Sequence, residues 1–392
     1  MNILFVTGLF ANDERDTALG GMSGAVYKSA LGMQQRGHSV RILACAGRER
    51  RWRYQGLDVI SVRVGQGIEE KAAGAMLIDT LKRELAVRRY VQKLDCEKAI
   101  DIVQYTGWFG VGLLHPYGIP AVMRMSSYTK VQLSNNFSTG KRFLLEAVEY
   151  LAAKRMNFVF APSRITAAGL EKDIQRAVGV METPFRQEET KWDDSILRSR
   201  LESKRYLLFF GRMTVDKGIY VIRDMLHEIL DRYREIQVVF AGGINRHEGV
   251  LVSDELMEAA GEHGSRVVFL GLLPKERLLP VIDGAELILM PSLTDNFPNA
   301  CAEAMSLGKI VIGTDGSSLE QFIQDGVNGY LVERNNPGQL CRCVDRVLRM
   351  EPGQKELVSI RARKKIEGLD LESYSKKMEK VYTRVIKLQQ RD

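Results

Sequence analysis

The chain has 392 residues, of which 45% are hydrophobic and 27% charged, and its formal net charge is +7. This length is too great for one ordinary hydrophobic core and suits two domains, and the composition excludes a disordered or fibrous protein. No stretch approaches the roughly 18 apolar residues that span a bilayer. The opening segment 1–11 is apolar but lacks a basic start and a small-residue cleavage site, so it is interpreted as a buried strand rather than a signal peptide.

The positive charge is concentrated in the first half. Residues 1–190 carry 26 Lys and Arg against 19 Asp and Glu, whereas residues 191–392 carry 30 of each sign. A basic half favours an anionic partner such as a membrane, a nucleic acid or an acidic substrate, although solvated helix faces explain the charge equally well. The five cysteines are few, odd in number and irregularly spaced, which favours free thiols in a reducing cytoplasm.

Short apolar strands alternate with longer helical patterns along the first half, which predicts a parallel α/β architecture. The helix expected at 71–94 is amphipathic, with Leu77, Leu81 and Leu85 spaced by four as its apolar stripe. The expected strands are 2–8, 39–45, 56–64, 101–105, 120–125 and 157–163, and the expected helices are 23–36, 71–94 and 141–156.

The second half repeats this plan, so two similar domains are expected. The polar segment 181–204, which contains Pro184, is interpreted as the boundary between them, and 372–390 as a terminal helix. In such sheets ligands bind at the carboxyl ends of the strands, so the chemistry is sought in the loops that follow strands. The expected strands are 205–212, 236–243, 266–271, 285–292 and 309–316, and the expected helices include 216–233 and 300–307.

Two glycine-containing loops have the composition of phosphate sites. Gly20 and Gly21 precede a helix, where free N–H groups and close backbone approach suit a phosphate, although a structural glycine turn explains them equally well. In "FFGRMTVDKG" (209–218), Arg212 and Lys217 lie between a strand and a helix, so they can clamp a diphosphate. A solvated basic loop is the alternative.

A third loop, "LTDNFPNACAEAM" (293–305), places two carboxylates around a helix start. Asp295 lies in the turn and Glu303 lies on the helix that begins near Asn299. A carboxylate on that helix can accept two hydrogen bonds from a vicinal diol. Taken singly, Asp295 could be a helix cap and Glu303 a solvated helix residue.

In combination, these loops resemble the GT-B-fold retaining glycosyltransferases of family four, in the order "GGMSG", "GRMTVDKG", "PSLTDNFPNACAEAMSLGKIVI" and "DGVNGYLV". The resemblance extends over nearly the whole chain. It implies two facing Rossmann-like domains with parallel sheets and a C-terminal helix that crosses back to the first domain. The corresponding domains are 1–185 on the acceptor side, 201–370 for the nucleotide-sugar, and 371–392 for the terminal helix.

The same resemblance assigns the residues of the donor site. Arg212 and Lys217 would hold the diphosphate, Glu303 the ribose hydroxyls, and Asp295 the donor sugar, with Arg212, Lys217 and Asp295 closest to the chemistry. The remaining donor-binding positions are Gly20, Gly21, Leu272, Asn296, Phe297, Pro298 and Asn299. The first signature carboxylate is Asp rather than Glu, and Asn-Phe-Pro replaces the usual Gly-Phe-Gly.

The family's first-domain histidine has no clear match in this chain. Tyr105, Thr106 and Trp108 are the candidates that occupy that region, and His115 is interpreted as a packing or surface histidine. Neither a cofactor nor a metal is expected, because no Asp-x-Asp motif ends a strand.

The expected function is the transfer of a sugar from a nucleoside diphosphate to a hydroxyl of a carbohydrate or glycolipid acceptor, with the anomeric configuration retained. UDP is the expected nucleoside diphosphate, and bacterial surface polysaccharide or glycolipid synthesis is the expected setting. The alternatives are a nucleotide-sugar epimerase of the same fold and a non-enzymatic protein that binds anionic ligands. No nucleic-acid motif is present. A cytoplasmic protein is expected, with peripheral contact to the anionic inner face of the membrane through 48–56 and 82–90.

Overall fold

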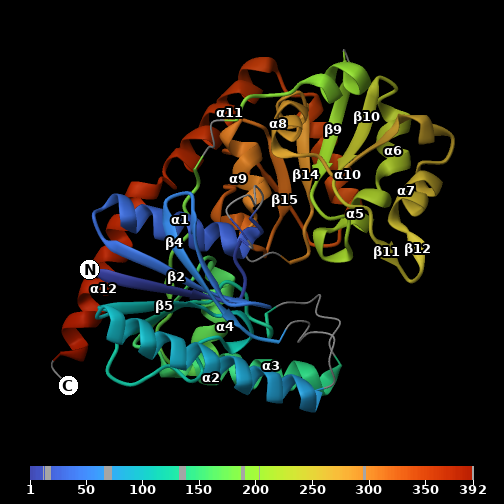
Figure 1. Cartoon of the computed structure of the whole chain (residues 1–392). Helices are drawn as coiled ribbons and strands as arrows, with labels where there is room; N and C mark the ends of the chain where they lie inside the picture. Colours follow the sequence, from blue (N-terminus) through green and yellow to red (C-terminus); the bar gives the residue numbers. More distant parts are fainter. Residues whose placement is uncertain are drawn as a thin grey trace. The chain divides into compact units, whose positions relative to one another are not determined.

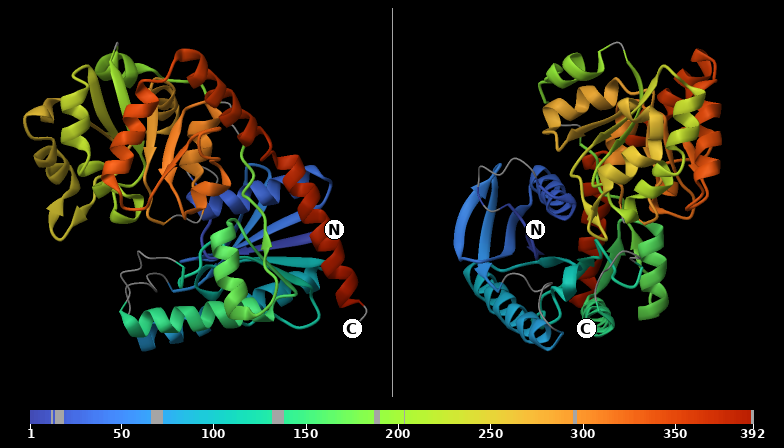
Figure 2. Two further views of the ribbon diagram at one scale, coloured as in Figure 1. Left: turned by 180° about the vertical axis from the view of Figure 1, so that it is seen from behind. Right: turned by 90° about the vertical axis from the view of Figure 1, so that its right-hand side faces the viewer.

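The computed structural model describes residues 1–11, 13, 19–65, 73–131, 138–186, 190–202, 204–294 and 297–390. The chain forms two compact units (Figure 1). Unit 1 comprises residues 1–186 together with 369–392, and unit 2 comprises residues 187–368. Each unit is built on one large sheet with helices on both faces, as Figure 2 shows from two further directions.

Unit 1 contains an eight-stranded sheet in the order β3-β4-β2-β1-β5-β6-β7-β8. All neighbouring strands are parallel except β3, which runs antiparallel to β4 at the edge. The strands are β1 (Asn2–Thr7), β2 (Ser39–Ala46), β3 (Arg50–Tyr54), β4 (Leu57–Arg63), β5 (Ile102–Thr106), β6 (Ala121–Arg124), β7 (Phe158–Ala161) and β8 (Gly179–Val180). The helices are α1 (Gly21–Gln35), α2 (Ala73–Glu97), η2 (Trp108–Gly110), α3 (Thr139–Arg155), α4 (Arg164–Ile174) and α12 (Leu371–Gln389).

The sheet of unit 1 is buried on both faces because its strands are apolar on both sides. On β1, Ile3 and Phe5 belong to the core that packs against α1 and α12, whereas Leu4 and Val6 belong to the core beneath α2, α3 and α4. Successive side chains of a strand point to opposite faces, so a continuous apolar run serves both cores. This explains why the strands are uninterrupted apolar segments in the sequence.

Helix α12 closes the first of these cores from the far end of the chain. Its Tyr382 hydroxyl donates a hydrogen bond to Gln104 on β5. Glu379 forms an ion pair with Arg36 and a hydrogen bond with Nε2 of His38 at 3.0 Å. The C-terminal helix therefore packs on the first unit, and the predicted α/β fold class is confirmed.

Two details of unit 1 correct the sequence prediction. Leu77, Leu81 and Leu85 are 38%, 39% and 46% exposed, because the buried side of α2 is formed by other residues, including the ion-paired Arg83 and Glu84. Residues 50–54 are the edge strand β3, which was not expected because arginines alternate with aromatic residues along it.

Unit 2 contains a six-stranded, fully parallel sheet in the order β13-β10-β9-β14-β15-β16. Its strands are β9 (Arg205–Phe210), β10 (Ile236–Ala241), β13 (Val267–Gly271), β14 (Leu287–Met290), β15 (Val311–Thr314) and β16 (Tyr330–Val332), and β11 (Arg246–His247) and β12 (Val250–Leu251) form a hairpin. Its helices are η3 (Leu197–Leu201), η4 (Val215–Lys217), α5 (Ile219–Arg223), α6 (Leu226–Arg232), α7 (Val252–Ala260), η5 (Gly261–Arg266), α8 (Lys275–Asp283), α9 (Asn299–Ser306), η6 (Ser318–Gln321), α10 (Pro337–Leu348) and α11 (Pro352–Glu367).

The helix expected at 216–233 is wrong in one respect, because this segment forms three short pieces, η4, α5 and α6, rather than one helix. Gly218, with φ of 72°, separates η4 from α5, and α6 begins after Met225. A residue in the left-handed region cannot continue a right-handed helix. The break leaves Lys217 at the end of η4, in the connection between β9 and α5, rather than within a long helix.

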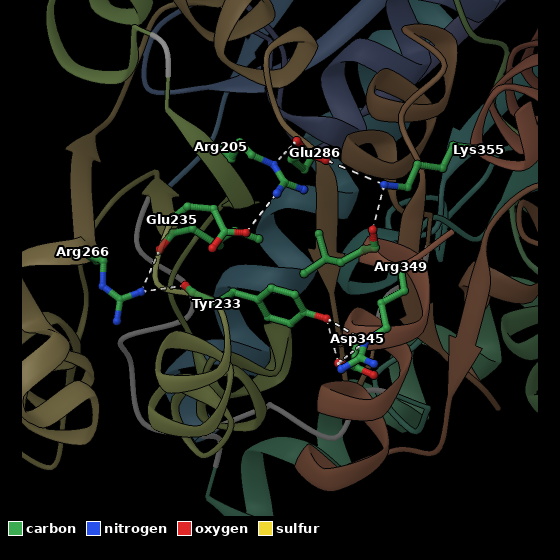
Figure 3. A network of polar contacts seen from close by, with 10 residues as sticks. Arg205, Tyr233, Glu235, Arg266, Glu286, Asp345, Arg349 and Lys355 are labelled. Carbon is green, nitrogen blue, oxygen red and sulfur yellow. Dashed lines mark hydrogen bonds and ion pairs between the residues drawn. The ribbon is translucent and has the colours of Figure 1, made fainter. Parts of the chain in front are cut away.

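A network of polar contacts covers the amino ends of the strands in unit 2 (Figure 3). Arg205, which opens β9, pairs with Glu286 at 2.8 Å and with Glu235 at 3.0 Å. Below them the Tyr233 hydroxyl donates to Asp345 at 2.7 Å. Because these side chains pair with one another, their polar groups are satisfied within the protein.

Candidate functional site

The switch point of the unit 2 sheet lies between β9 and β14. After β9 the chain builds β10 and β13 on one side, and it then returns to place β14, β15 and β16 on the other side. The loops that follow β9 and β14 therefore leave the sheet in opposite directions, which opens the crevice where parallel sheets bind ligands. Arg212 and Lys217 follow β9, and the segment from Phe297 to Glu303 follows β14.

The two loops at the switch point are joined to each other. The backbone N–H of Leu293 donates to the carbonyl of Asp216 at 2.8 Å. Gly218 lies against the other loop, since a Cβ built there would be 1.8 Å from the carbonyl oxygen of Pro291. Only glycine fits this contact, so Gly218 fixes Lys217 beside the segment that leads into α9.

The cations of the first loop differ in their surroundings. Arg212 is exposed, and the part of the chain that the structure describes holds no hydrogen-bond or ion-pair partner for its guanidinium. Lys217 is half-buried at the end of η4. Between them, the hydroxyl of Thr214 is buried and has no partner among the described residues. This hydroxyl was not singled out from the sequence, where it is an ordinary Thr within a motif chosen for its charges.

The second loop leads into α9, which carries Glu303 in its second turn. Pro298 precedes the helix, Asn299 opens it, and no acidic residue lies in its first turn. The ring of Phe297 meets Phe322 edge to face, with 4.9 Å between centroids, which anchors the loop on the segment after β15. Asp295 and Asn296 lie outside the described residues. Glu303 is half-buried at this edge of the sheet.

The loops after β10 and β13 complete this edge. Leu272 directly follows β13 and is 84% exposed. The loops are connected by backbone hydrogen bonds, from Gly242 to the carbonyl of Gly271 at 2.8 Å and from Gly211 to the carbonyl of Ala241 at 2.9 Å. The structure therefore brings Arg212, Lys217, Leu272, Phe297, Pro298, Asn299 and Glu303 to one edge of unit 2.

Gly20 and Gly21 lie in unit 1, where α1 begins after the loop that follows β1. Gly20 is the N-cap residue of α1, and both Gly20 and Gly21 are exposed. A Cβ built on Gly20 would meet no atom within 4 Å. Packing of the described residues therefore does not require glycine at this position.

Buried carboxylates on α2 and α3 hold the loops at the carboxyl edge of unit 1. Glu84 accepts a hydrogen bond from the N–H of Gly112 at 2.9 Å, and Glu149 accepts one from the N–H of Thr129 at 2.9 Å. Burial raises the pKa of Glu149 to about 8, and burial also raises the pKa of Glu84 although Arg83 opposes this. The sequence does not reveal them, because an acidic residue on an amphipathic helix is normally solvated.

The residues considered in place of the first-domain histidine are mostly core residues. Tyr105 is fully buried and its hydroxyl lies 2.8 Å from Nδ1 of His115, which confirms His115 as a packing residue. Thr106 is also buried. Only Trp108 is half-buried, and its ring fills the space against Gly8, where a Cβ would lie 2.1 Å from it.

Comparison with known proteins identifies the family. A model of a glycosyl transferase 4-like domain matches residues 20–178, and a model of the glycosyl transferases group 1 matches residues 204–350. The chain belongs to the group 1 glycosyltransferases. The matches cover most of both units, and they include the loops that carry Gly20, Arg212 and Glu303, so the predicted family is confirmed.

Several named proteins are similar in sequence to this chain over part of their length. An uncharacterized glycosyltransferase of Methanocaldococcus jannaschii is 32% identical over 168 residues, which are 42% of this chain and 41% of that protein. A lipopolysaccharide 1,2-N-acetylglucosaminetransferase of Salmonella typhimurium is 25% identical over 200 residues, or 48% of this chain and 52% of the relative. The chain thus spans about half or less of the length of these curated relatives.

Solved structures confirm the GT-B fold over the whole of this group 1 glycosyltransferase. Sucrose-phosphate synthase of Thermosynechococcus elongatus superimposes with a TM-score of 0.78 at 16% identity, covering 99% of this chain and 100% of that structure. HepE of Anabaena, solved with UDP and glucose, superimposes with a TM-score of 0.72 at 17% identity, covering 98% and 100%. At these identities the similarity concerns the fold alone.

Proposed function

We propose that the protein is a retaining glycosyltransferase that moves a hexose from a UDP-sugar to an acceptor hydroxyl. The observation that carries this proposal is the pair of joined loops at the switch point of unit 2. One loop supplies Arg212 and Lys217, and the other leads to α9 and Glu303. Two cations and a carboxylate at the carboxyl edge of a parallel sheet match the two ends of a nucleoside diphosphate, the diphosphate and the ribose.

The chemistry required of the site is charge stabilisation. When the sugar leaves, negative charge develops on the diphosphate, and Arg212 and Lys217 are positioned to stabilise it without reorganisation. The bond from the anomeric carbon to the phosphate oxygen breaks, and the bond to the acceptor oxygen forms on the same face. The departing phosphate oxygen accepts the acceptor's proton, so no side-chain base is needed.

The remaining assignments divide the donor between its parts. Glu303 accepts hydrogen bonds from the ribose hydroxyls, and the backbone at Leu272 meets the base. Gly20 and Gly21, at the helix start in the acceptor-side unit, are assigned to the phosphates. Asp295 is assigned to the donor sugar, together with Asn296, Phe297, Pro298 and Asn299. The unsatisfied hydroxyl of Thr214 is a further donor for a phosphate oxygen, because a buried hydroxyl without a partner is unfavourable.

The names of the relatives support the choice of donor and setting. HepE was solved with UDP-glucose as well as with UDP and glucose. The relatives include D-inositol 3-phosphate glycosyltransferases, such as that of Mycobacterium leprae, 32% identical over 130 residues, and the lipopolysaccharide enzyme described above. These support a UDP-sugar donor and an acceptor in bacterial surface polysaccharide or glycolipid synthesis.

A UDP-release assay with and without acceptors tests the function. Release of UDP that depends on an acceptor, with a product whose anomeric configuration equals that of the donor by NMR, is the expected result. Conversion of the nucleotide-sugar into its epimer without an acceptor would instead establish the epimerase alternative. A product of inverted configuration would refute the retaining mechanism.

We propose that unit 1 makes peripheral contact with the surface of an anionic membrane. Helix α2 exposes Leu77, Ile78, Leu81 and Leu85 beside basic residues of the same helix, an arrangement that suits a lipid surface with negative charge. The segment 48–56 supports it less, since Arg51 and Arg53 pair with Glu97 and Asp58. No helix in the described part of the chain is long and apolar enough to cross a membrane. Sedimentation with acidic liposomes at low salt is expected to show weak binding that Leu81→Glu abolishes.

A further inference from the structure

A cavity of about 390 Å³ lies at the carboxyl edge of the unit 1 sheet, outside the residues assigned to the donor. Its floor is the end of β2, with Ala44, Cys45 and Ala46. Its sides come from the loop after β1, the turn between β2 and β3, and β3 and β4. The volume lies within the range typical of small-molecule sites. We call it the β2–β3 pocket. Its polar and aromatic lining consists of Phe10, Arg48, Arg50, Trp52 and Ser61.

The lining of the β2–β3 pocket is positively charged. Arg48 and Arg50 line it, and no described carboxylate does. Glu49, which lies between them in the turn, is not among the residues that line the pocket. Arg48 is exposed, and its guanidinium makes no hydrogen bond or ion pair with any described residue. The pocket therefore presents the guanidinium of Arg48 as a cationic hydrogen-bond donor, and its described lining contains no carboxylate.

The aromatic part of the pocket orients one of these cations. The guanidinium of Arg50 lies 4.3 Å from the centroid of the Trp52 ring, a cation–π contact that holds it in place. The indole nitrogen of Trp52 is buried and has no partner among the described residues. A buried indole N–H normally donates a hydrogen bond, so this one is available to an acceptor group that enters beside it.

The turn that carries the arginines is itself fixed. The hydroxyl of Ser61 on β4 donates to the carbonyl of Arg48 at 2.9 Å and accepts from the N–H of Arg50 at 3.1 Å. Burial raises the pKa of the Cys45 thiol to about 12, so the sulfur is neutral and the floor of the pocket is apolar. The cavity thus combines an apolar floor with a rim of placed cations.

We propose that the β2–β3 pocket binds an anionic sugar unit of the acceptor, with the ring on the apolar floor and its carboxylate or phosphate against Arg48 and Arg50. The acidic group accepts from the two guanidinium groups, and a ring hydroxyl accepts from the indole of Trp52. This inference rests on the proposed function, because it names the class of acceptor. The loop that contributes Phe10 to the pocket also leads to Gly20 at the start of α1, so one loop serves both sites.

Tryptophan fluorescence of the full-length protein tests the proposal, because Trp52, one of three tryptophans in the chain, lines the pocket. Glucuronate and glucose 1-phosphate are the probes with a charge, glucose is the neutral ring, and inorganic phosphate is the charge alone. We expect a saturable change with at least one charged sugar, and the stronger of the two identifies a carboxylate or a phosphate. Trp52→Phe should remove the change without altering the midpoint of thermal unfolding.

Arg48→Ala and Arg53→Ala form a matched pair of variants. Both remove one exposed arginine near the same strand, but Arg53 lies outside the pocket and pairs with Asp58. Arg48→Ala should raise the Kd of the charged sugar at least tenfold, and Arg53→Ala should leave it within twofold. The proposal would be overturned if neither charged sugar gave a saturable response, or if glucose or inorganic phosphate bound with equal affinity. An equal loss of affinity for the charged sugar in both variants would also overturn it.

Calorimetry with UDP on the same preparation separates this inference from the function on which it rests. Binding of UDP without any response of Trp52 to charged sugars would refute the pocket and leave the donor site intact. A response of Trp52 without binding of UDP would support the pocket as an anionic-sugar site and refute the donor site in unit 2.

Discussion

Replacing Gly218 by alanine tests whether the two loops at the switch point form one site. A Cβ at this position would lie 1.8 Å from the carbonyl oxygen of Pro291, whereas ordinary contacts are 3.4–4 Å, and the backbone has φ of 72°. The left-handed conformation costs about 1–2 kcal/mol once a Cβ is present, and overpacking costs about 1–3 kcal/mol more. Gly218→Ala should therefore lower the free energy of unfolding of unit 2 by roughly 2–5 kcal/mol.

Gly326→Ala is the matched control for this substitution. Gly326 has φ of 69°, but a Cβ there would meet no atom within 4 Å, so this variant carries only the backbone cost. Urea unfolding measures the stability of both variants, and calorimetry with UDP measures the site. Gly218→Ala should weaken the binding of UDP, because the substitution separates Lys217 from the loop that leads to α9. Equal losses of stability in the two variants, or unchanged affinity for UDP in Gly218→Ala, would refute the reasoning.

Three further predictions concern the donor and the buried carboxylates. Glu303→Ala should weaken the binding of both UDP and the UDP-sugar, by roughly 1.5–3 kcal/mol per lost hydrogen bond. Asp295→Ala should leave the binding of UDP unchanged and lower the turnover of the full donor. Calorimetry of both variants with both ligands decides this, and an equal loss of UDP binding in the two variants would make Asp295 a structural cap. Activity should survive EDTA, since Arg212 and Lys217 neutralise the diphosphate, and a strict need for added magnesium or manganese would contradict this. Because burial raises the pKa of Glu149 from about 4.5 to about 8, the folded protein retains a proton that the unfolded chain releases, so the free energy of unfolding should fall as pH rises through this interval. Glu149→Gln should reduce that slope in urea unfolding measured from pH 5 to 8, with the buried Glu84 contributing the remainder, and an unchanged slope would show that Glu149 does not cause it.

Much of the architecture could be predicted because parallel strands are buried on both faces. A strand such as β1 is a continuous apolar run that is recognisable without a partner, and the loops after such strands contain Arg212, Lys217 and Glu303. The edge strand β3 was missed because only one of its faces is buried. Trp52 and Tyr54 face the core while Arg51 and Arg53 face outward, which reads as a basic surface segment.

The parts that could not be predicted depend on contacts between distant residues. The spacing of Leu77, Leu81 and Leu85 indicates an apolar stripe, but it does not say that Glu84 turns inward to hold Gly112 while the leucines remain exposed. In the same way, the β2–β3 pocket arises from three separate stretches, at 10–11, 44–52 and Ser61, and no single one of them carries its signal.

The most direct test of the central claim is the stabilisation of the protein by UDP in the wild type and in the Arg212→Ala and Lys217→Ala variants. At 100 times its dissociation constant, UDP should raise the free energy of unfolding of the wild type by roughly 2.7 kcal/mol. At the same concentration the effect should be largely lost in both variants, and their turnover should fall by roughly two to three orders of magnitude. Equal stabilisation of all three proteins, or none by any nucleoside diphosphate, would contradict a donor site at the switch point of unit 2.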